Sequence, residues 1–374
     1  MDKKRGVYIH VPFCIRKCRY CDFPSFEDRE HIDSYFKALI TEIRDEKETA
    51  GRITDTIYIG GGTPSCVPPL YISSVMEALS KTYVIEDDAE ISMEMNPGTV
   101  DPGALKVYRS AGINRVSLGC QSFNDKSLRT LGRIHSSDDI RNTFEKLRDA
   151  GFDNINLDLI SSLPGESGTD MERSLRKAAA LSPEHISVYS LIIEEGTVFH
   201  ELSMKNELKG LPDEEEQAET DLMVRTVLKD FGYSRYEISN YAKEGFECRH
   251  NIRYWKREDY RGFGLSAASL IGNRRFTNTR KMVYINQPGG SFEEDRTLSR
   301  KEEMEEFMFL GLRMTEGVSA DDFLRYFGRD ITEVYGGQLK EQMADGFLEY
   351  NGKRYFYNDR GLDVSNILLS AFLF

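Results

Sequence analysis

Cysteine and tryptophan are scarce in this chain, whose 374 residues include six cysteines and one tryptophan. Six cysteines in a chain of this length do not form the dense disulfide framework of small secreted domains. No long apolar segment precedes Pro12 and Cys14, so we expect no secretory signal. No run approaches the roughly 20 apolar residues that span a bilayer. We therefore expect a cytoplasmic protein, and peripheral association with a membrane is compatible with these features.

The chain also has no excess of positive charge. Its 49 Lys and Arg residues are outnumbered by 62 Asp and Glu residues, which gives a formal net charge of −13. Proteins that bind nucleic acid usually carry basic patches that contact phosphates. We therefore expect no nucleic-acid partner.

Three of the cysteines form one compact motif. Cys14, Cys18 and Cys21 have the spacing CxxxCxxC and directly follow a short apolar run. A cubane iron–sulfur cluster is usually held by four thiolates, so a loop that offers three leaves one iron open for a small-molecule ligand. The alternative is a zinc site with His10 or His31 as the fourth ligand. Zinc sites favour two CxxC-like pairs, however, and the sequence has no second pair.

Up to about residue 191 the chain alternates short β-rich runs with amphipathic helical stretches. This alternation predicts βαβ units and a parallel sheet, and six strands suit a partial (β/α)6 barrel. A doubly wound open sheet is the alternative. The predicted strands are Gly6–Val11, Thr56–Gly60, Glu90–Asn96, Arg115–Gly119, Asn154–Ile160 and His185–Leu191, and the predicted helices are Ile32–Ala50, Leu70–Thr82, Pro102–Ala111, Asp138–Ala150 and Met171–Leu181.

Polar residues gather where these predicted strands end. In barrel-like α/β folds, ligands bind at the carboxyl ends of the strands. Each such residue alone could be a turn or a cap, but five strand ends together predict a shared pocket. The residues concerned are the three cysteines after the first strand, Gly60 to Pro64, Glu94 with Asn96, Gln121 and Asp158.

The second half of the chain changes in composition. The acidic run from Asp213 to Asp221 is typical of the solvated start of a helix. Residues 233–270 are rich in aromatics and glycine, and we expect them to form a segment that closes over the barrel mouth. Helices followed by strands around the turn Asn351-Gly352 predict a small winged-helix-like α+β domain. The helix before that turn is acidic, which argues against DNA binding. We predict a barrel over 1–230, a connecting segment over 231–290 and the C-terminal domain over 291–374.

The cysteine motif, with an aromatic residue, Tyr20, before its last cysteine, resembles the radical S-adenosylmethionine (SAM) superfamily. The longer strings Tyr8–Cys14 and Cys21–Phe23 resemble the HemW heme chaperones and their relatives, the oxygen-independent coproporphyrinogen III oxidases. The resemblance covers essentially the whole chain. It implies a radical-SAM barrel in which the thiolates of Cys14, Cys18 and Cys21 hold a [4Fe–4S] cluster, and the open iron binds SAM.

The resemblance also implies a set of SAM-binding residues. SAM carries a sulfonium, an ammonium, a carboxylate and a ribose diol, so carboxylate and guanidinium groups suit it. The glycine-rich stretch is not a P-loop, because it lacks the Lys-Ser/Thr ending; by resemblance it lies against the methionine moiety. The residues implied are Tyr8, Tyr20, Gly61, Gly62, Thr63, Glu94, Gln121, Arg133 and Asp158.

A second group of residues, 248–255, contains a histidine and the only tryptophan of the chain. Neutral imidazole is a common axial ligand of heme iron, and aromatic rings can cover a porphyrin face. Packing against the barrel is the alternative role. The pattern is not the CxxCH attachment motif of c-type cytochromes. It resembles the HNxxYW motif of HemW proteins, which implies His250 as a heme ligand.

Two departures separate the chain from the oxidases that it resembles. Phe23 stands where the oxidases have a fourth cysteine, and the long segment that they carry before the motif is absent here. We therefore predict a heme chaperone that binds heme, a [4Fe–4S] cluster and SAM and passes heme to an unidentified acceptor protein, for which a membrane location is compatible. The alternatives are a coproporphyrinogen III oxidase that acts through a 5′-deoxyadenosyl radical and a zinc-stabilised regulator. No catalytic residue is predicted.

Overall fold

The fold is described from a computed structural model that places residues 4–373. Its main sheet has twelve strands, and the six central strands are parallel neighbours in chain order. These strands agree with the predicted ones to within a few residues, apart from earlier starts of the second and third. They are β1 (Arg5–Val11), β2 (Ile53–Gly61), β3 (Val84–Met95), β4 (Arg115–Gln121), β5 (Ile155–Ser161) and β6 (His185–Ser190).

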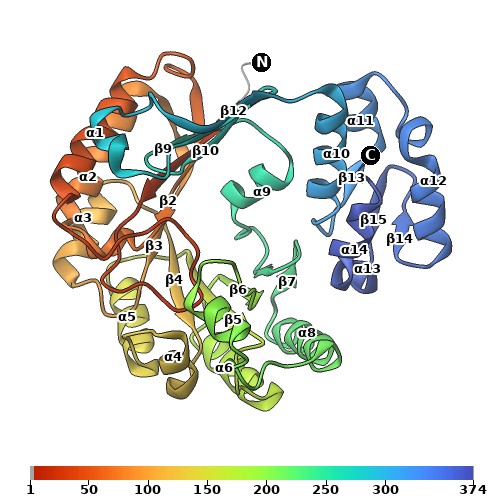
Figure 1. The fold of residues 1–374 in the computed structure, drawn as a ribbon, viewed down its shortest axis with the longest axis horizontal. Coiled ribbons are helices and arrows are strands. Elements are labelled where there is room, and N and C mark those ends of the chain that lie inside the picture. The colour runs from red at the N-terminus through yellow and green to blue at the C-terminus, as the bar shows by residue number, and fades with distance from the viewer. Residues whose placement is uncertain (1–3, 374) are drawn as a thin grey trace.

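The strand order confirms the partial barrel rather than the doubly wound sheet. A doubly wound sheet reverses direction near its first strand, whereas here β1 to β6 follow one another without a reversal. The sheet does not close on itself, because β1 is paired with β9 and β6 with β8 instead of with each other. The result is an open, curved half-barrel (Figure 1).

The helices between the parallel strands cover the outer side of the curved sheet (Figure 1). Five of these helices were predicted, although α1 ends at residue 45 rather than 50, and the short helix after β4 was not; a further short helix that was not predicted follows β6. The acidic run does open a helix, and Asp213 caps it by accepting a hydrogen bond from the N–H of Glu216. The predicted helices are α1 (Ile32–Asp45), α2 (Pro69–Thr82), α3 (Pro102–Ser110), α5 (Ser137–Asp149), α6 (Gly168–Ala180) and α8 (Glu214–Asp230), and the others are α4 (Asp125–Leu131) and α7 (Val198–Met204).

Strand residues alternate between an apolar outer face and a more polar inner face. In β1, Val7, Ile9 and Val11 are fully buried in the core beneath the helices, whereas Tyr8 and His10 lie on the other face. The same period of two continues through β2 to β6, as expected for side chains that point to opposite faces of a strand. The inside of the half-barrel is therefore lined by groups that can form hydrogen bonds.

The segment over residues 231–290 differs from its prediction. It extends both edges of the sheet instead of covering the mouth, since β8 pairs with β6 and β9 pairs with β1. Its helix α9 (Arg249–Trp255) contacts the beginnings of the strands, opposite to their carboxyl ends. The added strands are β7 (Ser234–Arg235), β8 (Asn240–Ala242), β9 (Tyr260–Phe263), β10 (Ala268–Ile271), β11 (Arg274–Asn278) and, beyond this segment, β12 (Phe292–Thr297).

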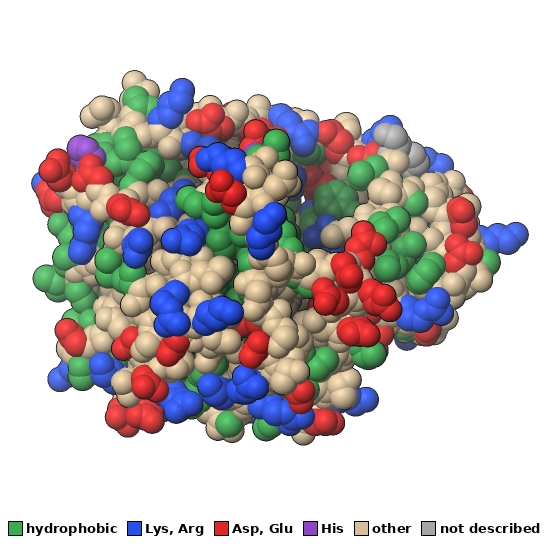
Figure 2. Space-filling model, turned by 60° about the horizontal axis from the view of Figure 1, so that its bottom comes forward, with side chains coloured by type: hydrophobic (Ala, Val, Ile, Leu, Met, Phe, Trp, Pro, Cys, Tyr) green, Lys and Arg blue, Asp and Glu red, His purple; other side chains and the backbone are tan. Residues whose placement is uncertain are grey.

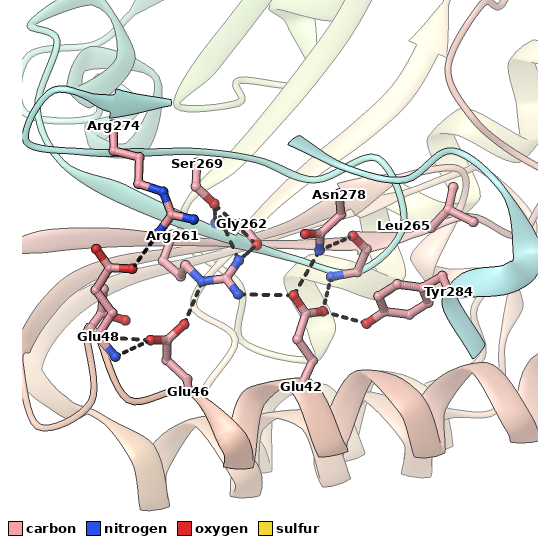
Figure 3. Close-up of polar contacts among 12 residues, drawn as sticks. Glu42, Glu46, Glu48, Arg261, Gly262, Leu265, Ser269, Arg274, Asn278 and Tyr284 are labelled. Carbon is pink, nitrogen blue, oxygen red and sulfur yellow. Dashed lines mark hydrogen bonds and ion pairs between the residues drawn. The ribbon is translucent and has the colours of Figure 1, made fainter. Parts of the chain in front are cut away.

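A buried carboxylate on α1 fastens this extension to the barrel (Figure 3). Glu42 accepts hydrogen bonds from the N–H of Gly264 at 2.9 Å, from Asn278 Nδ2 at 2.8 Å and from the hydroxyl of Tyr284. It also forms an ion pair with Arg261 at 3.1 Å. A buried charge is tolerated when it is paired and fully hydrogen-bonded, so this network fixes β9 and β11 beside β1.

The C-terminal domain has its own hydrophobic core and a three-stranded antiparallel sheet, which confirms the winged-helix-like prediction. It lies beyond the open side of the half-barrel (Figure 1). The domain boundaries themselves stay a prediction. Its elements are α10 (Arg300–Gly311), β13 (Val318–Ser319), α11 (Ala320–Phe327), α12 (Ile331–Ala344), β14 (Leu348–Tyr350), β15 (Arg354–Tyr357), α13 (Asp359–Asp363) and α14 (Ser365–Ser370).

On the face shown in Figure 2, acidic and basic side chains are interspersed with apolar ones. Among residues 4–373, no helix combines the length and the apolar character needed to cross a bilayer.

Candidate functional site

One cavity of about 400 Å³ lies at the carboxyl ends of the parallel strands. It brings together the three motif cysteines and eight of the nine residues implied as SAM contacts. The sequence expectation of one shared pocket thus agrees with the geometry. The predicted residues that line it are Cys14, Cys18, Cys21, Tyr20, Gly61, Gly62, Thr63, Glu94, Gln121, Arg133 and Asp158.

The cysteine loop is held at both ends by backbone hydrogen bonds. The N–H of Cys14 donates to the carbonyl of Phe26 at 2.9 Å, and the N–H of Phe26 donates to Pro12 at 2.7 Å. Farther along the loop, the N–H of Arg19 donates to the carbonyl of Leu131 at 3.0 Å. The loop is therefore clamped between β1 and the end of α4, with its three thiols toward the cavity.

A buried histidine supports this loop from beneath. His10 Nε2 lies 2.9 Å from the carbonyl oxygen of Pro24, which can only accept, so Nε2 must carry the proton. Nδ1 then accepts from the hydroxyl of Tyr8 at 3.0 Å. Burial lowers the pKa of His10 to about 4, so the ring is neutral. Tyr8, implied as a SAM contact, stacks on the cavity residue Tyr58 and orients His10.

The donor set fits an iron–sulfur cluster better than a single zinc ion. Among residues 4–373, no three His, Cys, Asp or Glu side chains lie close enough together to bind one metal ion. Zinc holds its ligands at about 2.3 Å, whereas thiolates around a four-iron cluster are spread farther apart. His10 is already hydrogen-bonded at both ring nitrogens, and His31 lies exposed before α1. Three thiols on one loop at a cavity wall suit a cluster.

The glycines after β2 are needed for close packing. Gly61 has a φ of 113°, and a Cβ there would lie 2.5 Å from the His10 ring. A Cβ at Gly62 would lie 2.7 Å from the carbonyl oxygen of Phe13, next to the first cysteine. The sequence predicted these glycines for close approach to a ligand. Their contacts show that they also let the end of β2 press against the cysteine loop.

Glu94 is a half-buried carboxylate that accepts from two donors. It accepts from the N–H of Gly61 at 3.0 Å and from the hydroxyl of Tyr58 at 3.1 Å. Burial, with a smaller contribution from the charge of Asp158, raises the pKa of Glu94 to about 7. An acid whose pKa lies near neutrality in a cavity changes its charge readily when a cationic ligand binds.

Arg133 joins the cysteine loop to the end of β3. Its guanidinium donates to the hydroxyl of Tyr20 at 2.7 Å and to Asn96 Oδ1 at 3.0 Å. Asn96 Nδ2 in turn donates to the hydroxyl of Thr63 at 2.8 Å. Burial alone would lower the pKa of Arg133, but nearby Tyr20 and the cysteines keep it raised, so the side chain is a fixed cation. A fixed guanidinium suits a carboxylate ligand.

Three residues that line this cavity each have a buried atom without a hydrogen-bond partner among the described residues. The atoms are Ser25 Oγ, Gln121 Oε1 and Arg133 Nε. Gln121 also has a φ of 59°, a left-handed backbone that non-glycine residues seldom adopt. The two carboxylates of Glu94 and Asp158 and the guanidinium of Arg133 lie around one space and match a ligand that carries ammonium, hydroxyl and carboxylate groups, as SAM does.

His250, predicted as a heme ligand, lies outside this cavity. It is 1% exposed at the other end of the barrel and stacks on Tyr58. Nδ1 lies 2.9 Å from the hydroxyl of Thr56, and Nε2 lies 2.8 Å from that of Tyr254. Burial lowers the pKa of His250 to about 3, so it is neutral. Ligation of heme iron stays a prediction, and it requires one ring nitrogen to exchange its partner.

Several residues that line the cavity were not predicted, among them three polar residues on the strands themselves. Tyr58, Ser117 and Tyr189 line the cavity from the inner faces of β2, β4 and β6. Each occupies the same inward phase of the strand alternation as the other polar barrel residues. The period of two in the strands was the signal that could have identified them.

Comparison with known proteins gives the family. The profile of the Radical SAM superfamily matches residues 8–178, and that of the HemN C-terminal domain matches residues 298–364. The heme chaperone HemW of Bacillus subtilis is 36% identical over 376 residues, which cover 99% of each chain. Its counterparts in Synechocystis sp. and Escherichia coli are 38% and 33% identical, covering 98% of this chain and 95% and 98% of theirs.

Among solved structures, coproporphyrinogen III oxidase (HemN) from Escherichia coli, described as a radical SAM enzyme, superposes with a TM-score of 0.87. The two chains are 23% identical, and the match covers 100% of this chain and 90% of the other. At that identity the likeness shows the fold alone. The full-length relatives carry the assignment, and on their identity the chain belongs to the HemW family within the radical SAM superfamily.

Proposed function

We propose that this protein is a heme chaperone that holds a [4Fe–4S] cluster through Cys14, Cys18 and Cys21, binds SAM and heme, and transfers heme to an acceptor protein. The observation that carries the proposal is the cavity in which the three thiols meet eight of the implied SAM contacts. The printed names of the full-length relatives support the heme part. A cytoplasmic location and an acceptor at a membrane are further parts of the proposal.

The residues of the cavity fall into three groups with different roles. The cysteines supply thiolates, and a bound cluster would supply an open iron and an electron. The carboxylates of Glu94 and Asp158 would face the cationic groups and the ribose diol of SAM, and the guanidinium of Arg133 would face its carboxylate. Tyr20 and Thr63 hold Arg133 in place, Tyr20 directly and Thr63 through Asn96.

Anaerobic reconstitution tests the proposal. The protein is loaded with iron and sulfide, then titrated with SAM and with hemin, and heme loss to excess heme-free myoglobin is followed. We expect a broad cluster absorption that SAM perturbs, a sharp Soret band on adding hemin, and transfer of that band. A protein that takes up iron and SAM but never hemin would contradict the chaperone function.

The alternative activity is tested in the same preparation. Phe23, in the place of the fourth cysteine of the oxidases, is 62% exposed at the cavity rim. We expect no protoporphyrinogen IX when coproporphyrinogen III, SAM and a reductant are added. Its formation would favour the oxidase over the chaperone.

Glu94 should make SAM binding depend on pH. Because the pKa of Glu94 is raised to about 7, this acid is largely neutral below pH 7 and ionised above it. A cationic ligand favours the ionised form, so affinity should rise by about tenfold between pH 6 and pH 8. Glu94→Gln should flatten this dependence, as measured by SAM titration of the cluster spectrum. An equal slope in the variant would show that another group titrates.

His250 should matter for heme and not for the cluster. His250→Ala should weaken the hemin Soret band while iron and sulfide contents stay normal, because the residue lies at the opposite end of the barrel from the cysteines. Tyr254→Phe is the matched control, since it removes the hydrogen bond to Nε2 and keeps the ring. If Nε2 ligates iron, Tyr254→Phe should bind hemin at least as well as the wild type. Unchanged hemin binding by His250→Ala would make His250 a packing residue.

A further inference from the structure

A continuous chain of hydrogen bonds crosses the barrel interior from the cavity to α9. It begins at Asp158, which lines the cavity, and ends at the N–H of Cys248, the residue that precedes α9. Its intermediate side chains are almost completely buried. At the cavity end, Ser117 Oγ lies 2.6 Å from Asp158 Oδ2, and Asn156 Nδ2 lies 2.8 Å from Asp158 Oδ1 and 2.7 Å from Ser117 Oγ. Farther from the cavity, His185 Nδ1 lies 2.7 Å from Asn156 Oδ1. The hydroxyl oxygen of Tyr236 lies 2.8 Å from His185 Nε2 and 3.2 Å from the backbone nitrogen of Cys248.

The chemistry of the end groups fixes the direction of every link. A carboxylate only accepts, so Asn156 must turn its NH₂ group toward Asp158 and its oxygen toward His185. That oxygen requires a proton on Nδ1 of His185. Burial, helped by the charge of Arg115, lowers the pKa of His185 well below its usual value, so the neutral ring leaves Nε2 as an acceptor. The hydroxyl of Tyr236 then donates to Nε2.

With these directions, every donor in the chain points toward the cavity. The Tyr236 oxygen accepts from the N–H of Cys248, and each following proton is directed one step closer to Asp158. Reversing any single link would place two acceptors or two donors face to face. Chains of this kind polarise one another in a low dielectric, so a change at one end is felt along the chain.

The far end of the chain contacts the C-terminal domain. The carbonyl oxygen of Tyr236 accepts from the N–H of Thr315 at 3.0 Å. Helix α9 ends at Trp255, whose ring lies 5.7 Å from the guanidinium carbon of Arg313. In Figure 1 this helix lies between the half-barrel and the C-terminal domain.

We propose that His185 is a positioning residue, which holds Asp158 in the cavity and makes the packing of α9 respond to a ligand that engages Asp158. The inference rests on the proposed function, because SAM is the ligand concerned. When hydroxyl or cationic groups of a ligand contact Asp158, they share its carboxylate oxygens with the donors that already bind there. The hydrogen bonds behind Asp158 then change their geometry, as far as Tyr236 and Cys248. The coupling thus joins the cavity to the helix that bears His250.

Trp255 provides the readout, because it is the only tryptophan of the chain and lies at the end of α9. SAM is titrated into the cluster-loaded protein, and binding is followed by the cluster spectrum while Trp255 emission is recorded. We expect the emission to change with the same half-saturation as the cluster signal. Tyr236→Phe keeps the ring but removes the hydroxyl that joins His185 to Cys248, so this variant should bind SAM and lose the emission change.

Two further variants distinguish the hydrogen-bond chain from polar groups that lie beside it. Ser187→Ala is the matched control, because the Ser187 hydroxyl is buried and also contacts Asn156 Oδ1, at 3.2 Å, but lies beside the chain. It should keep the emission change. His185→Leu should lose the change and bind SAM about tenfold more weakly, since the donor that orients Asn156, and through Asn156 the carboxylate of Asp158, is gone.

A full emission change in Tyr236→Phe, or an equal loss in Ser187→Ala, would overturn the coupling. Wild-type protein that binds SAM without any change at Trp255 would overturn it as well, while leaving the proposed function intact. Wild-type protein that binds no SAM would overturn both.

Discussion

Replacing Cys14, Cys18 or Cys21 by Ala should abolish the reconstituted cluster. The three thiols are the protein ligands that the cavity offers, and a cluster held by three thiolates has no spare ligand to lose. The expected result is loss of nearly all bound iron and sulfide and of the broad visible absorption, measured on anaerobically reconstituted protein. SAM should then no longer perturb the spectrum.

Cys66 and Cys120 are the matched controls for this experiment. Cys66 is buried next to the loop, with its thiol 3.4 Å from the carbonyl oxygen of Phe13, and Cys120 is fully buried in β4. Both should keep full iron content when replaced by Ala. If either substitution removed the cluster as completely as Cys14→Ala, the assignment of ligands would be wrong.

The half-barrel was predictable because its signals are local. Apolar residues recur at every second position of the strands and at the helical period in the helices, and the alternation of the two kinds of element predicts a parallel α/β fold. The cavity followed from the same logic, since Glu94, Gln121 and Asp158 come at strand ends that meet at one edge. Boundaries shifted by a few residues where turns decide them, as at the end of α1.

The segment after residue 230 was harder because its pairing is non-local. β9 lies beside β1, some 250 residues earlier, and β9 to β11 are too short to show a clear period of two. The position of His250 in the fold could not be predicted from the sequence for the same reason. A histidine among aromatic residues reads as a ligand or as a packing residue from sequence alone. Its contacts with Thr56 at the beginning of β2 exist only in the folded barrel.

The polar interior of the barrel is a feature that the sequence could have predicted from the alternation of residues along the strands. Asn156, Asp158, His185 and Ser187 alternate with apolar neighbours in β5 and β6, which places all four on one face. Such a polar face inside a parallel sheet is costly unless its groups find partners. The alternation therefore predicts a hydrogen-bonded interior, although which group pairs with which depends on register.

Replacing Arg133 by Leu should weaken SAM binding by about a hundredfold, because removing one partner of a buried charge pair also leaves the other charge unpaired. The guanidinium is held by Tyr20 and Asn96, and Arg133 lines the cavity in which a carboxylate would bind. Arg133→Lys should recover part of the affinity, since it restores the charge without the planar fork. SAM titration of the reconstituted cluster measures the effect.

Iron content distinguishes this role from support of the cysteine loop. Arg133 also holds Tyr20, the residue just before Cys21, so a loosened loop would lose iron in the Leu variant. We expect the iron content to stay near that of the wild type, because Arg19 still fastens the loop through its backbone to Leu131. Arg129→Leu, an exposed change on α4, the helix that ends just before Arg133, should alter neither quantity. Normal SAM affinity in Arg133→Leu would remove this guanidinium from the ligand site, and a parallel loss of iron would make it a support of the loop.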